Sequence, residues 1–539
     1  MKKIFLFLIV ISINLASYSQ DKARTSELDA IFKIQRVLNY INYFYVDSES
    51  NAKLAEDAIV GILQHLDPHS IYIPKKEVEA MNEPLQGNFE GIGIQFAIVE
   101  DTVQVVAVIS GGPSEKVGLM PGDRIVKVDG KDFAGIGITN SDVVKTLRGK
   151  KGTKVKLLVK RPGEKKLLDF VIVRDKIPIF SLDAAYMVSP GIAYIKLNRF
   201  AIQTDKEFRT ALDSLKKHNK VKALILDLRG NGGGYLNVAI DLADEFLDDG
   251  KLVVYTKGRA VPKTDYNATD RGEFEKSPVV VLVDEGSASA SEIVTGAIQD
   301  WDRGVVIGRR TFGKGLVQRQ FPLQDSSMIR LTIAKYYTPS GRCIQKPYNE
   351  GVKKYAMDII DRYNRGELTS KDSIHFPDSL KYYTRVNKRV VYGGGGIMPD
   401  IFVPLDTTKK YSDAFAKILR KGLLNAYIAK YIDENRKDLE AKYPDFDTYL
   451  KNFNVDTILL SDLYNYAKNN KVKFKEKDKK GFMNDTIAAK TIKALIARDM
   501  WHTTQYFMII NKNDDVIKKA IEVLNNKKRY ENILKGNKH

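Results

Sequence analysis

The fold of this chain is indicated most clearly by the stretch Pro278-Val-Val-Val-Leu-Val-Asp284, followed directly by Glu285-Gly-Ser-Ala-Ser-Ala-Ser-Glu-Ile293. Its first half is a near-continuous apolar run, which is typical of a strand buried on both faces of a parallel sheet. Its second half places three serines among small residues, where the strand gives way to an apolar helical stretch. Hydroxyls at such a junction either cap the helix or lie where its N-terminal amides stabilise developing negative charge. The stretch alone leaves both interpretations open.

A second apolar run, Val221-Lys-Ala-Leu-Ile-Leu-Asp-Leu228, leads into the glycine-rich loop Arg229-Gly-Asn-Gly-Gly-Gly234. Glycines let the backbone approach a ligand closely and point amides at it. The loop can therefore bind phosphate, form an oxyanion hole or simply make a tight turn. Because such runs alternate with helical stretches between 171 and 405, we predict an α/β domain there.

A third loop, Gly308-Arg-Arg-Thr-Phe-Gly-Lys-Gly-Leu-Val-Gln318, nearly matches a phosphate-binding P-loop. In a P-loop a Ser or Thr follows the lysine and holds magnesium, whereas Gly315 follows Lys314 here. The sequence therefore disfavours a nucleotide site.

Between 85 and 170, short alternating runs and glycine turns predict a small β-rich domain. The Gly91-Ile-Gly-Ile94 turn and the later string GGPSEKVGLMPGDRIVKVDGKDF at 111–133 together resemble a PDZ domain. Successive amides in a turn formed by Gly91, Ile92, Gly93 and Ile94 can hold a terminal carboxylate, while an extended peptide adds as a strand to the neighbouring edge. We therefore expect this module to bind protein C-termini.

The three loops together resemble the carboxyl-terminal processing (tail-specific) serine proteases, over roughly residues 60–405. The segments that carry the resemblance are Ser-Ala-Ser-Ala-Ser-Glu-Ile at 287–293, Phe-Gly-Lys-Gly at 312–315 with a glutamine four residues after the lysine, Tyr-Tyr-Thr-Pro-Ser-Gly-Arg at 336–342 and Gly-Ile-Met-Pro-Asp at 396–400. The resemblance implies a multidomain α/β protein with a ClpP/crotonase-like protease core after the PDZ domain.

The resemblance also implies roles for individual residues. The nucleophile falls on Ser289 and the general base on Lys314, while Gln318 matches the glutamine that orients the lysine. The oxyanion hole falls on the backbone amides of Ala290 and Gly233.

A lysine base requires a neutral amine, so the pKa of Lys314 has to fall from about 10.4 toward 7–8 through burial and separation from carboxylates. Gln318 suits this requirement, because its carbonyl can orient the amine without adding negative charge that would raise that pKa. Asp300 also matches a family carboxylate, whose role the sequence leaves open. Neither a GxSxG elbow around Ser289 nor a His-Glu-x-x-His zinc motif is present. We expect no cofactor and no metal.

Both ends of the chain lie outside this core. Residues 1–19 combine two lysines, an apolar run and small polar residues, as a secretory signal peptide does. We therefore expect an exported protein, most simply a periplasmic one, which stays membrane-attached if the signal is not cleaved. Later stretches are too short or too charged to span a bilayer. Helical spacing predicts an N-terminal helical region over 20–84 and a helical C-terminal extension over 406–539.

The composition limits the partners. The 539 residues carry a net charge of +19, and the C-terminal extension holds 28 Lys and Arg against 18 Asp and Glu. Because acids interrupt the basic run at 471–480, that run is more typical of a solvated face than of a nucleic-acid site. Cys343 is the single cysteine, which excludes an internal disulfide and a cysteine zinc cluster.

These observations predict an exported serine endopeptidase that recognises protein C-terminal tails through its PDZ domain and cleaves peptide bonds with a Ser–Lys dyad through an acyl-enzyme. The alternative is a non-catalytic scaffold that binds tails through the same domain. The expected partners are proteins with free C-terminal tails, and an adaptor protein or further copies of the chain are additional candidates.

Overall fold

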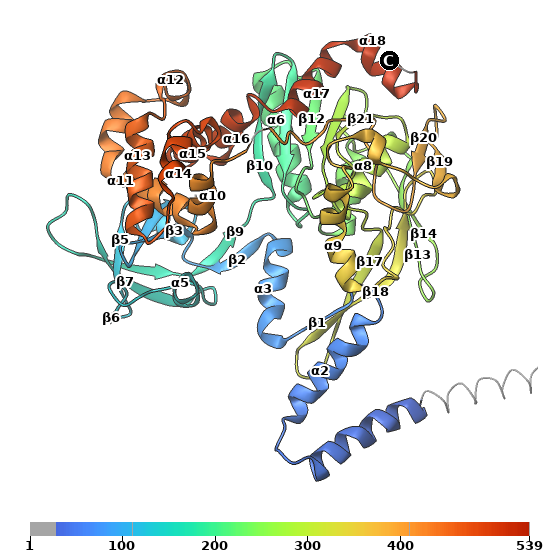
Figure 1. Cartoon of the computed structure of the whole chain (residues 1–539), viewed down its shortest axis with the longest axis horizontal. Coiled ribbons are helices and arrows are strands. Elements are labelled where there is room, and N and C mark those ends of the chain that lie inside the picture. The colour runs from blue at the N-terminus through green and yellow to red at the C-terminus, as the bar shows by residue number, and fades with distance from the viewer. Residues whose placement is uncertain (1–27, 110, 409, 538–539) are drawn as a thin grey trace, which may run out of the picture. The chain divides into compact units, whose positions relative to one another are not determined.

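The structure is a computed structural model that describes residues 28–109, 111–408 and 410–537 (Figure 1). The predicted signal peptide at 1–19 lies outside the described residues. The chain divides into two compact units. The first comprises the described residues up to Lys75 together with Gln318–Thr332 and Glu350–Val352, and the second comprises the other segments.

The first unit contains helices and a small antiparallel pairing. It is helical at 28–44 and in α2 (Asn51–Gln64). The strand β1 (Ile71–Ile73) pairs with residues 328–330 at the start of β18 (Met328–Tyr337). The strand β17 (Leu316–Pro322) also pairs with β18. The helix α3 (Lys75–Gln86) follows β1 along the chain.

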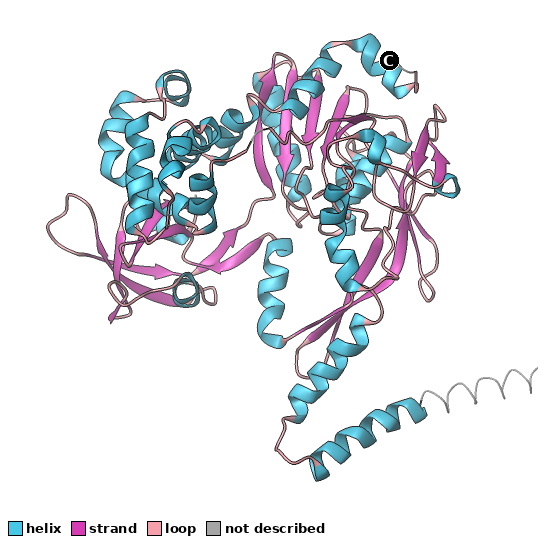
Figure 2. Cartoon of the chain, viewed as in Figure 1, coloured by secondary structure: helices cyan, strands magenta, loops and turns pink. Residues whose placement is uncertain are grey.

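A six-stranded sheet lies at the centre of the second unit (Figure 2). Its strand order is β10 (Leu182–Ser189), β11 (Ile192–Leu197), β12 (Ala223–Asp227), β15 (Val279–Val283), β16 (Val305–Gly308) and β21 (Ile401–Phe402). All pairings from β11 onward are parallel, whereas β10 is antiparallel to β11. Every residue of β12 and β15 is buried. The prediction of two buried strands in these stretches is confirmed.

Two sets of helices cover the two faces of this sheet. The first set is α6 (Thr204–His218), α7 (Leu236–Asp244) and α8 (Ala290–Asp300). The second set is α17 (Asp515–Asn525) and α18 (Lys527–Leu534), from the far end of the chain. Because side chains alternate along a strand, Leu226 packs with the first set and its neighbour Ile225 with the second. The last two helices of the predicted C-terminal extension therefore complete the core of the sheet.

The β-rich module before this sheet has its own hydrophobic core. Its main strands, in spatial order, are β3 (Ile94–Val99), β4 (Thr102–Val108), β5 (Arg124–Val128), β7 (Lys154–Lys160) and β8 (Leu168–Val173), and β6 (Lys131–Asp132) pairs with β5. Two helices, α4 (Pro113–Lys116) and α5 (Asn140–Leu147), complete it. The pairing of β2 (Asn88–Gly91) with β9 (Asp175–Pro178) brings the two ends of the module together.

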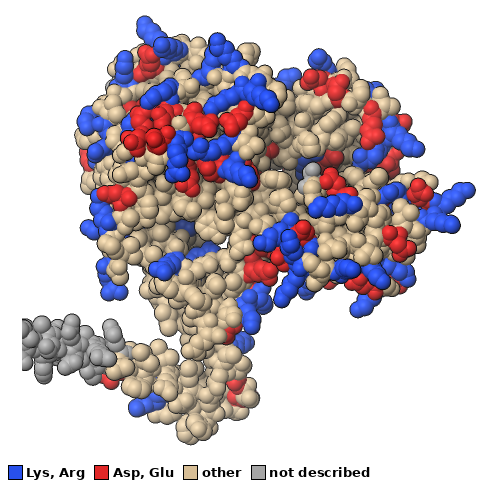
Figure 3. Space-filling view, turned by 180° about the vertical axis from the view of Figure 1, so that it is seen from behind, with Lys and Arg blue, Asp and Glu red and all other residues tan. Residues whose placement is uncertain are grey.

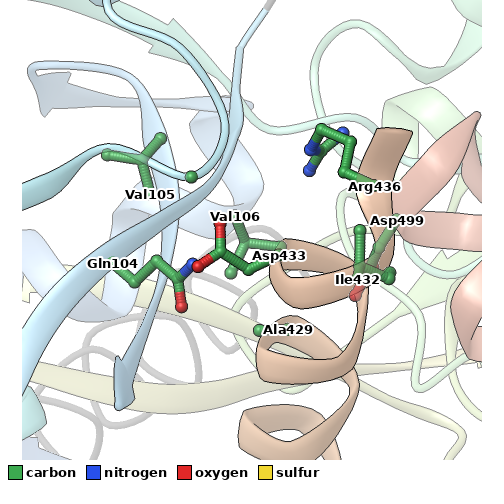
Figure 4. Close-up of a pocket in the computed structure, with 9 residues that line it drawn as sticks. Gln104, Val105, Val106, Ala429, Ile432, Asp433, Arg436 and Asp499 are labelled. Carbon is green, nitrogen blue, oxygen red and sulfur yellow. The ribbon is translucent and has the colours of Figure 1, made fainter. Parts of the chain in front are cut away.

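Residues 413–511 form a helical region with a separate core. Its helices are α10 (Asp413–Arg420), α11 (Leu423–Lys442), α12 (Phe446–Asn452), α13 (Thr457–Asn469), α14 (Glu476–Met483), α15 (Thr486–Met500) and α16 (Thr503–Asn511). The helix α11 contacts the β-rich module, where Asp433 pairs with Arg124 at 3.6 Å. Figure 4 shows Asp433 extending from α11 toward Gln104 of β4. A salt bridge therefore connects the helical region to the module.

Shorter elements complete the second unit. The strand β13 (Leu252–Lys257) pairs with β14 (Thr264–Asn267) and with residues 335–337 of β18. The hairpin of β19 (Lys381–Tyr383) and β20 (Val390–Tyr392) follows α9 (Val352–Asn364) and two 3-10 turns, Lys371–Ser373 and Asp378–Leu380. The boundaries at 84, 170 and 405 stay predictions.

Candidate active site

The glycine loop, residues 229–234, and the serine loop, residues 285–293, meet at one edge of the central sheet. They follow β12 and β15, which are adjacent and parallel, so their carboxyl ends lie at the same edge. The amide of Ala288 donates to the carbonyl of Asn231 at 3.0 Å. The hydroxyl of Ser291 donates to the same carbonyl at 2.8 Å. Two loops that are more than 50 residues apart in the chain thus form one structure.

The three serines of the loop have different surroundings. Ser287 and Ser291 are fully buried, and their hydroxyls donate to the carbonyls of Leu228 and Asn231, respectively. Ser289 is only half-buried. It precedes α8, with φ of 56° and ψ of −113°. A positive φ strains a residue with a Cβ, and such strain is concentrated at functional sites. These surroundings favour Ser289 among the three as a reactive hydroxyl.

Gly233 lies directly against the Ser289 turn. A Cβ placed on it would lie 2.8 Å from the Cβ of Ser289 and 2.9 Å from the amide nitrogen of Ala290. Its φ of +98° also favours glycine. Its amide donates to the side-chain oxygen of Asn231 at 2.9 Å. The structure therefore places Gly233 and Ala290 together, while their role as an oxyanion hole stays a prediction.

A buried carboxylate, Glu292, joins the serine loop to the loop at 308–318, which contains Lys314 and is called the lysine loop below. Its Oε2 accepts the amides of Ser289 and Lys314, both at 2.9 Å. Its Oε1 accepts the amide of Gly313 at 2.8 Å and the hydroxyl of Thr311 at 2.5 Å. One side chain thus fixes the backbone at both predicted members of the dyad.

Glu292 is not among the residues predicted from the sequence, although a signal for it is present. Ser289-Ala-Ser-Glu292 has the spacing of a capping box, in which the fourth residue accepts the amide of the first. That pattern predicts the bond to Ser289 but not those to Gly313 and Lys314, which come from another loop.

The surroundings of Glu292 also affect its protonation. Burial raises the pKa of Glu292 to about 7, and the hydrogen bonds that its carboxylate accepts only partly oppose this rise. Glu292 is therefore a buried acid whose charge changes near neutral pH.

Lys314 and Gln318 belong to different compact units. Lys314 is half-buried and follows Gly313, whose φ is +88°. Gln318 lies on β17, and its side-chain amide donates to the hydroxyl of Thr332 at 3.3 Å. That hydroxyl donates in turn to Asp67 at 3.0 Å.

Comparison with known proteins identifies the family of the chain. Residues 191–355 match the model of peptidase family S41, and residues 91–172 match that of the PDZ domain. A carboxy-terminal-processing protease of Bartonella bacilliformis is 35% identical over 390 residues, which cover 69% of this chain and 89% of the relative. The chain belongs to peptidase family S41.

The chain is also similar to other known proteins. The carboxy-terminal processing protease CtpB of Bacillus subtilis is 34% identical to this S41 peptidase over 67% of the chain and 74% of the relative. A solved structure of a photosystem II D1 C-terminal processing protease is 30% identical, covers 58% of this chain and 83% of its own, and has a TM-score of 0.34. Residues 414–502 match a family of unknown function. The predicted fold class and serine-type peptidase activity are confirmed.

The predicted carboxylate-binding turn of the S41 peptidase lies between β2 and β3. Ile92 is buried, and its carbonyl accepts the amide and the hydroxyl of Ser114 at 3.1 and 2.6 Å. The carbonyl of Gly93 accepts the amide of Ile109 at 2.9 Å. These bonds fix the turn from Gly91 to Ile94 by the carbonyls of Ile92 and Gly93, while its role in binding a carboxylate stays a prediction.

Asp300 is part of the internal framework of the S41 peptidase. It is fully buried at the end of α8, where it pairs with the buried Arg342 at 2.7 Å and accepts the amide of Ser340 at 2.9 Å. Its carboxylate therefore holds the segment at 340–342 in place. Among the described residues, no group of His, Cys, Asp and Glu has the arrangement of a metal site.

Proposed function

We propose that this S41 peptidase cleaves peptide bonds with a Ser–Lys dyad. Ser289 is the nucleophile, Lys314 is the general base, and the amides of Ala290 and Gly233 form the oxyanion hole. Gln318 orients the lysine, an assignment that rests on the family resemblance. The observation that carries the proposal is that the carboxylate of Glu292 accepts the amides of both Ser289 and Lys314, which fixes two residues of distant loops together.

The reaction proceeds through an acyl-enzyme. The neutral amine of Lys314 takes the proton of the Ser289 hydroxyl as the oxygen attacks the substrate carbonyl. The tetrahedral oxyanion is stabilised by the two amides and by the N-terminal end of α8. The lysine ammonium then protonates the leaving amine. Water hydrolyses the ester by the same route and releases the new carboxylate. During these steps the amide of Gly233 must turn from the side-chain oxygen of Asn231 toward the substrate oxyanion.

We further propose that the PDZ domain binds the C-terminal tail of a protein substrate. The turn from Gly91 to Ile94 would hold the terminal carboxylate, and the tail would add as a strand beside β3. A relative whose name is carboxy-terminal-processing protease supports this substrate class.

Export and partners also stay proposals. The sequence of residues 1–19 supports export, most simply to the periplasm. In the described part of the chain, no helix combines the length and apolar character needed to cross a bilayer. On the face shown in Figure 3, Lys and Arg alternate with Asp and Glu, which does not favour nucleic acid as a partner. The helix at 28–44 exposes Ile31, Phe32 and Phe44, which supports an adaptor or a homo-oligomer.

The proposal is tested with an unfolded model protein that carries either a free or an amidated C-terminus. We expect wild type to cut the free form faster, and Ser289→Ala and Lys314→Ala to cut neither. Lys335→Ala, which removes an exposed lysine, serves as the control. Cleavage by Ser289→Ala would refute the nucleophile assignment. Tail binding by wild type without any cleavage would favour the non-catalytic scaffold instead.

A further inference from the structure

A contact between the C-terminal helices and the glycine loop extends the active site beyond the three segments that match known families. Asp514 immediately precedes α17, in the part of the chain that follows residue 502. One of its carboxylate oxygens accepts the amide of Ile517 at 2.9 Å and caps the helix. The other accepts Nη1 of Arg229 at 2.8 Å. The start of α17 is thereby bonded to the residue that begins the glycine loop.

Arg229 is held between two carboxylates. Asp227, the last residue of β12, accepts Nη2 of Arg229 at 2.7 Å and its Nε at 3.0 Å. The side chain of Arg229 is only 16% exposed, and that of Asp514 is 23% exposed. Burial alone would raise the pKa of Asp227, but the charges of Arg229 and Lys196 outweigh it and hold that pKa below its usual value. Asp227 thus binds the guanidinium through Nε and Nη2, and Asp514 binds it through Nη1.

The position of Arg229 determines where the glycine loop begins. Its amide donates to Asp227 at 2.9 Å, and its carbonyl accepts Nζ of Lys196 at 2.9 Å. The next amide, of Gly230, donates at 2.8 Å to Asp284, which directly precedes the serine loop. Gly233 then packs against Ser289 with no room for a Cβ. A shift of Arg229 would therefore be transmitted to the amide that we assign to the oxyanion hole.

We propose that Asp514 is a positioning residue for the oxyanion hole. Acting through Arg229, it holds the loop from Gly230 to Gly234 in register with Ser289. This inference rests on the proposed Ser–Lys mechanism. Because the oxyanion hole acts mainly in the transition state, loss of Asp514 should lower kcat and leave KM nearly unchanged.

The test uses the full chain with Asp514→Asn, which keeps a residue suited to capping and removes the charge that faces Arg229. Asp515→Asn, on the same helix, removes an equal charge from an exposed pair with Lys518 and is the control. We expect kcat of Asp514→Asn to fall roughly 10-fold, with KM within twofold and Tm within about 4 °C of wild type. Inhibition by a peptide boronate, a transition-state analogue, should weaken about 10-fold while binding of the uncleaved parent peptide to a Ser289→Ala background is unchanged.

Two further measurements keep the inference open to refutation. If Asp514→Asn does not fold, Asp514→Ser still caps the helix with a side chain too short to reach Arg229, and the same loss of kcat is expected. In an Arg229→Lys background, Asp514→Asn should cause little further loss, because the two residues act together. An unchanged kcat in Asp514→Asn, or an equal loss in Asp515→Asn, would overturn the inference while Ser289-dependent cleavage by wild type stands. Absence of that cleavage in wild type would instead overturn the proposed function itself.

Discussion

Glu292 is the residue on which the arrangement of the proposed dyad depends most directly. All four of its partners are donors, and they are divided evenly between its two oxygens. An ionised carboxylate can satisfy both sets, whereas an amide, like the protonated acid, must turn a donor toward one of them. The site thus requires an acid at this position and not merely a polar side chain.

Glu292→Gln is therefore expected to fold but to lose about 100-fold in kcat, since a displacement of roughly 1 Å at reacting groups has that effect. The free energy of unfolding should fall by about 1–3 kcal/mol, because buried donors are left without acceptors. Steady-state kinetics and thermal unfolding measure the two effects. Glu273→Gln, at an exposed position, should change neither. Full activity in Glu292→Gln would contradict the assigned role.

The raised pKa of Glu292 predicts a pH dependence of stability. Between its ordinary pKa of 4.5 and its folded pKa of about 7, the folded protein holds a proton that the unfolded chain releases. This contribution is fully present below pH 4.5 and is lost as pH rises through 7. Over that range it amounts to at most about 3 kcal/mol. Thermal unfolding between pH 5 and 8 should show a smaller decline for Glu292→Gln than for wild type.

The glycine loop and the serine loop pack so closely that a side chain at one glycine would separate them. Gly233 touches the Ser289 turn, whereas a Cβ on Gly232 would meet nothing within 4 Å. Of these two adjacent glycines, Gly232 therefore has room for a side chain and Gly233 has none.

Gly233→Ala is expected to abolish measurable cleavage, because its Cβ would force the loop away from Ser289 and its φ of +98° is unfavourable for alanine. Gly232→Ala should retain activity within a few-fold of wild type. Comparing kcat/KM for the two variants tests which glycine faces the nucleophile. Equal losses would mean that the loop tolerates no side chain at all and that Gly233 has no special place.

The strands and loops of the core could be predicted because their signals are local. The apolar runs at 221–228 and 278–284 each identify a buried strand, and the residue types in the following loops indicate chemistry. The bonds from Glu292 to Gly313 and Lys314 could not be predicted in this way. They join two different loops, and the periodicity of apolar residues does not indicate which loops lie close together in space. The same holds for α17 and α18, whose helical pattern does not state which surface they cover.

At the scale of the whole molecule, the last helices contribute to the stability of the protease core. Val516, Ile517, Val523, Tyr530 and Ile533 are buried against one face of the sheet. At about 2 kcal/mol for each buried apolar side chain, their removal costs about 10 kcal/mol. That is comparable with the entire stability of a typical domain, about 5–15 kcal/mol.

A chain that ends at residue 512, before α17, is therefore expected to be insoluble or to unfold without a cooperative transition. A chain that ends at residue 536, after α18, should behave like wild type. Solubility, circular dichroism and calorimetry distinguish the two. A soluble, active enzyme ending at 512 would show that the sheet does not need this cover.

The late position of α17 and α18 in the chain has a consequence for biosynthesis. The last strand of the sheet that they cover, β21, ends at Phe402, yet the covering helices begin at residue 515, more than 100 residues later. During synthesis one apolar face of the sheet therefore stays uncovered until α17 and α18 have been made. Because Asp514 directly precedes those helices, the glycine loop gains its bond to Asp514 only once this last part of the core has been made. A prematurely terminated chain that lacks α17 and α18 therefore lacks both the cover of the sheet and the bond between Asp514 and the glycine loop.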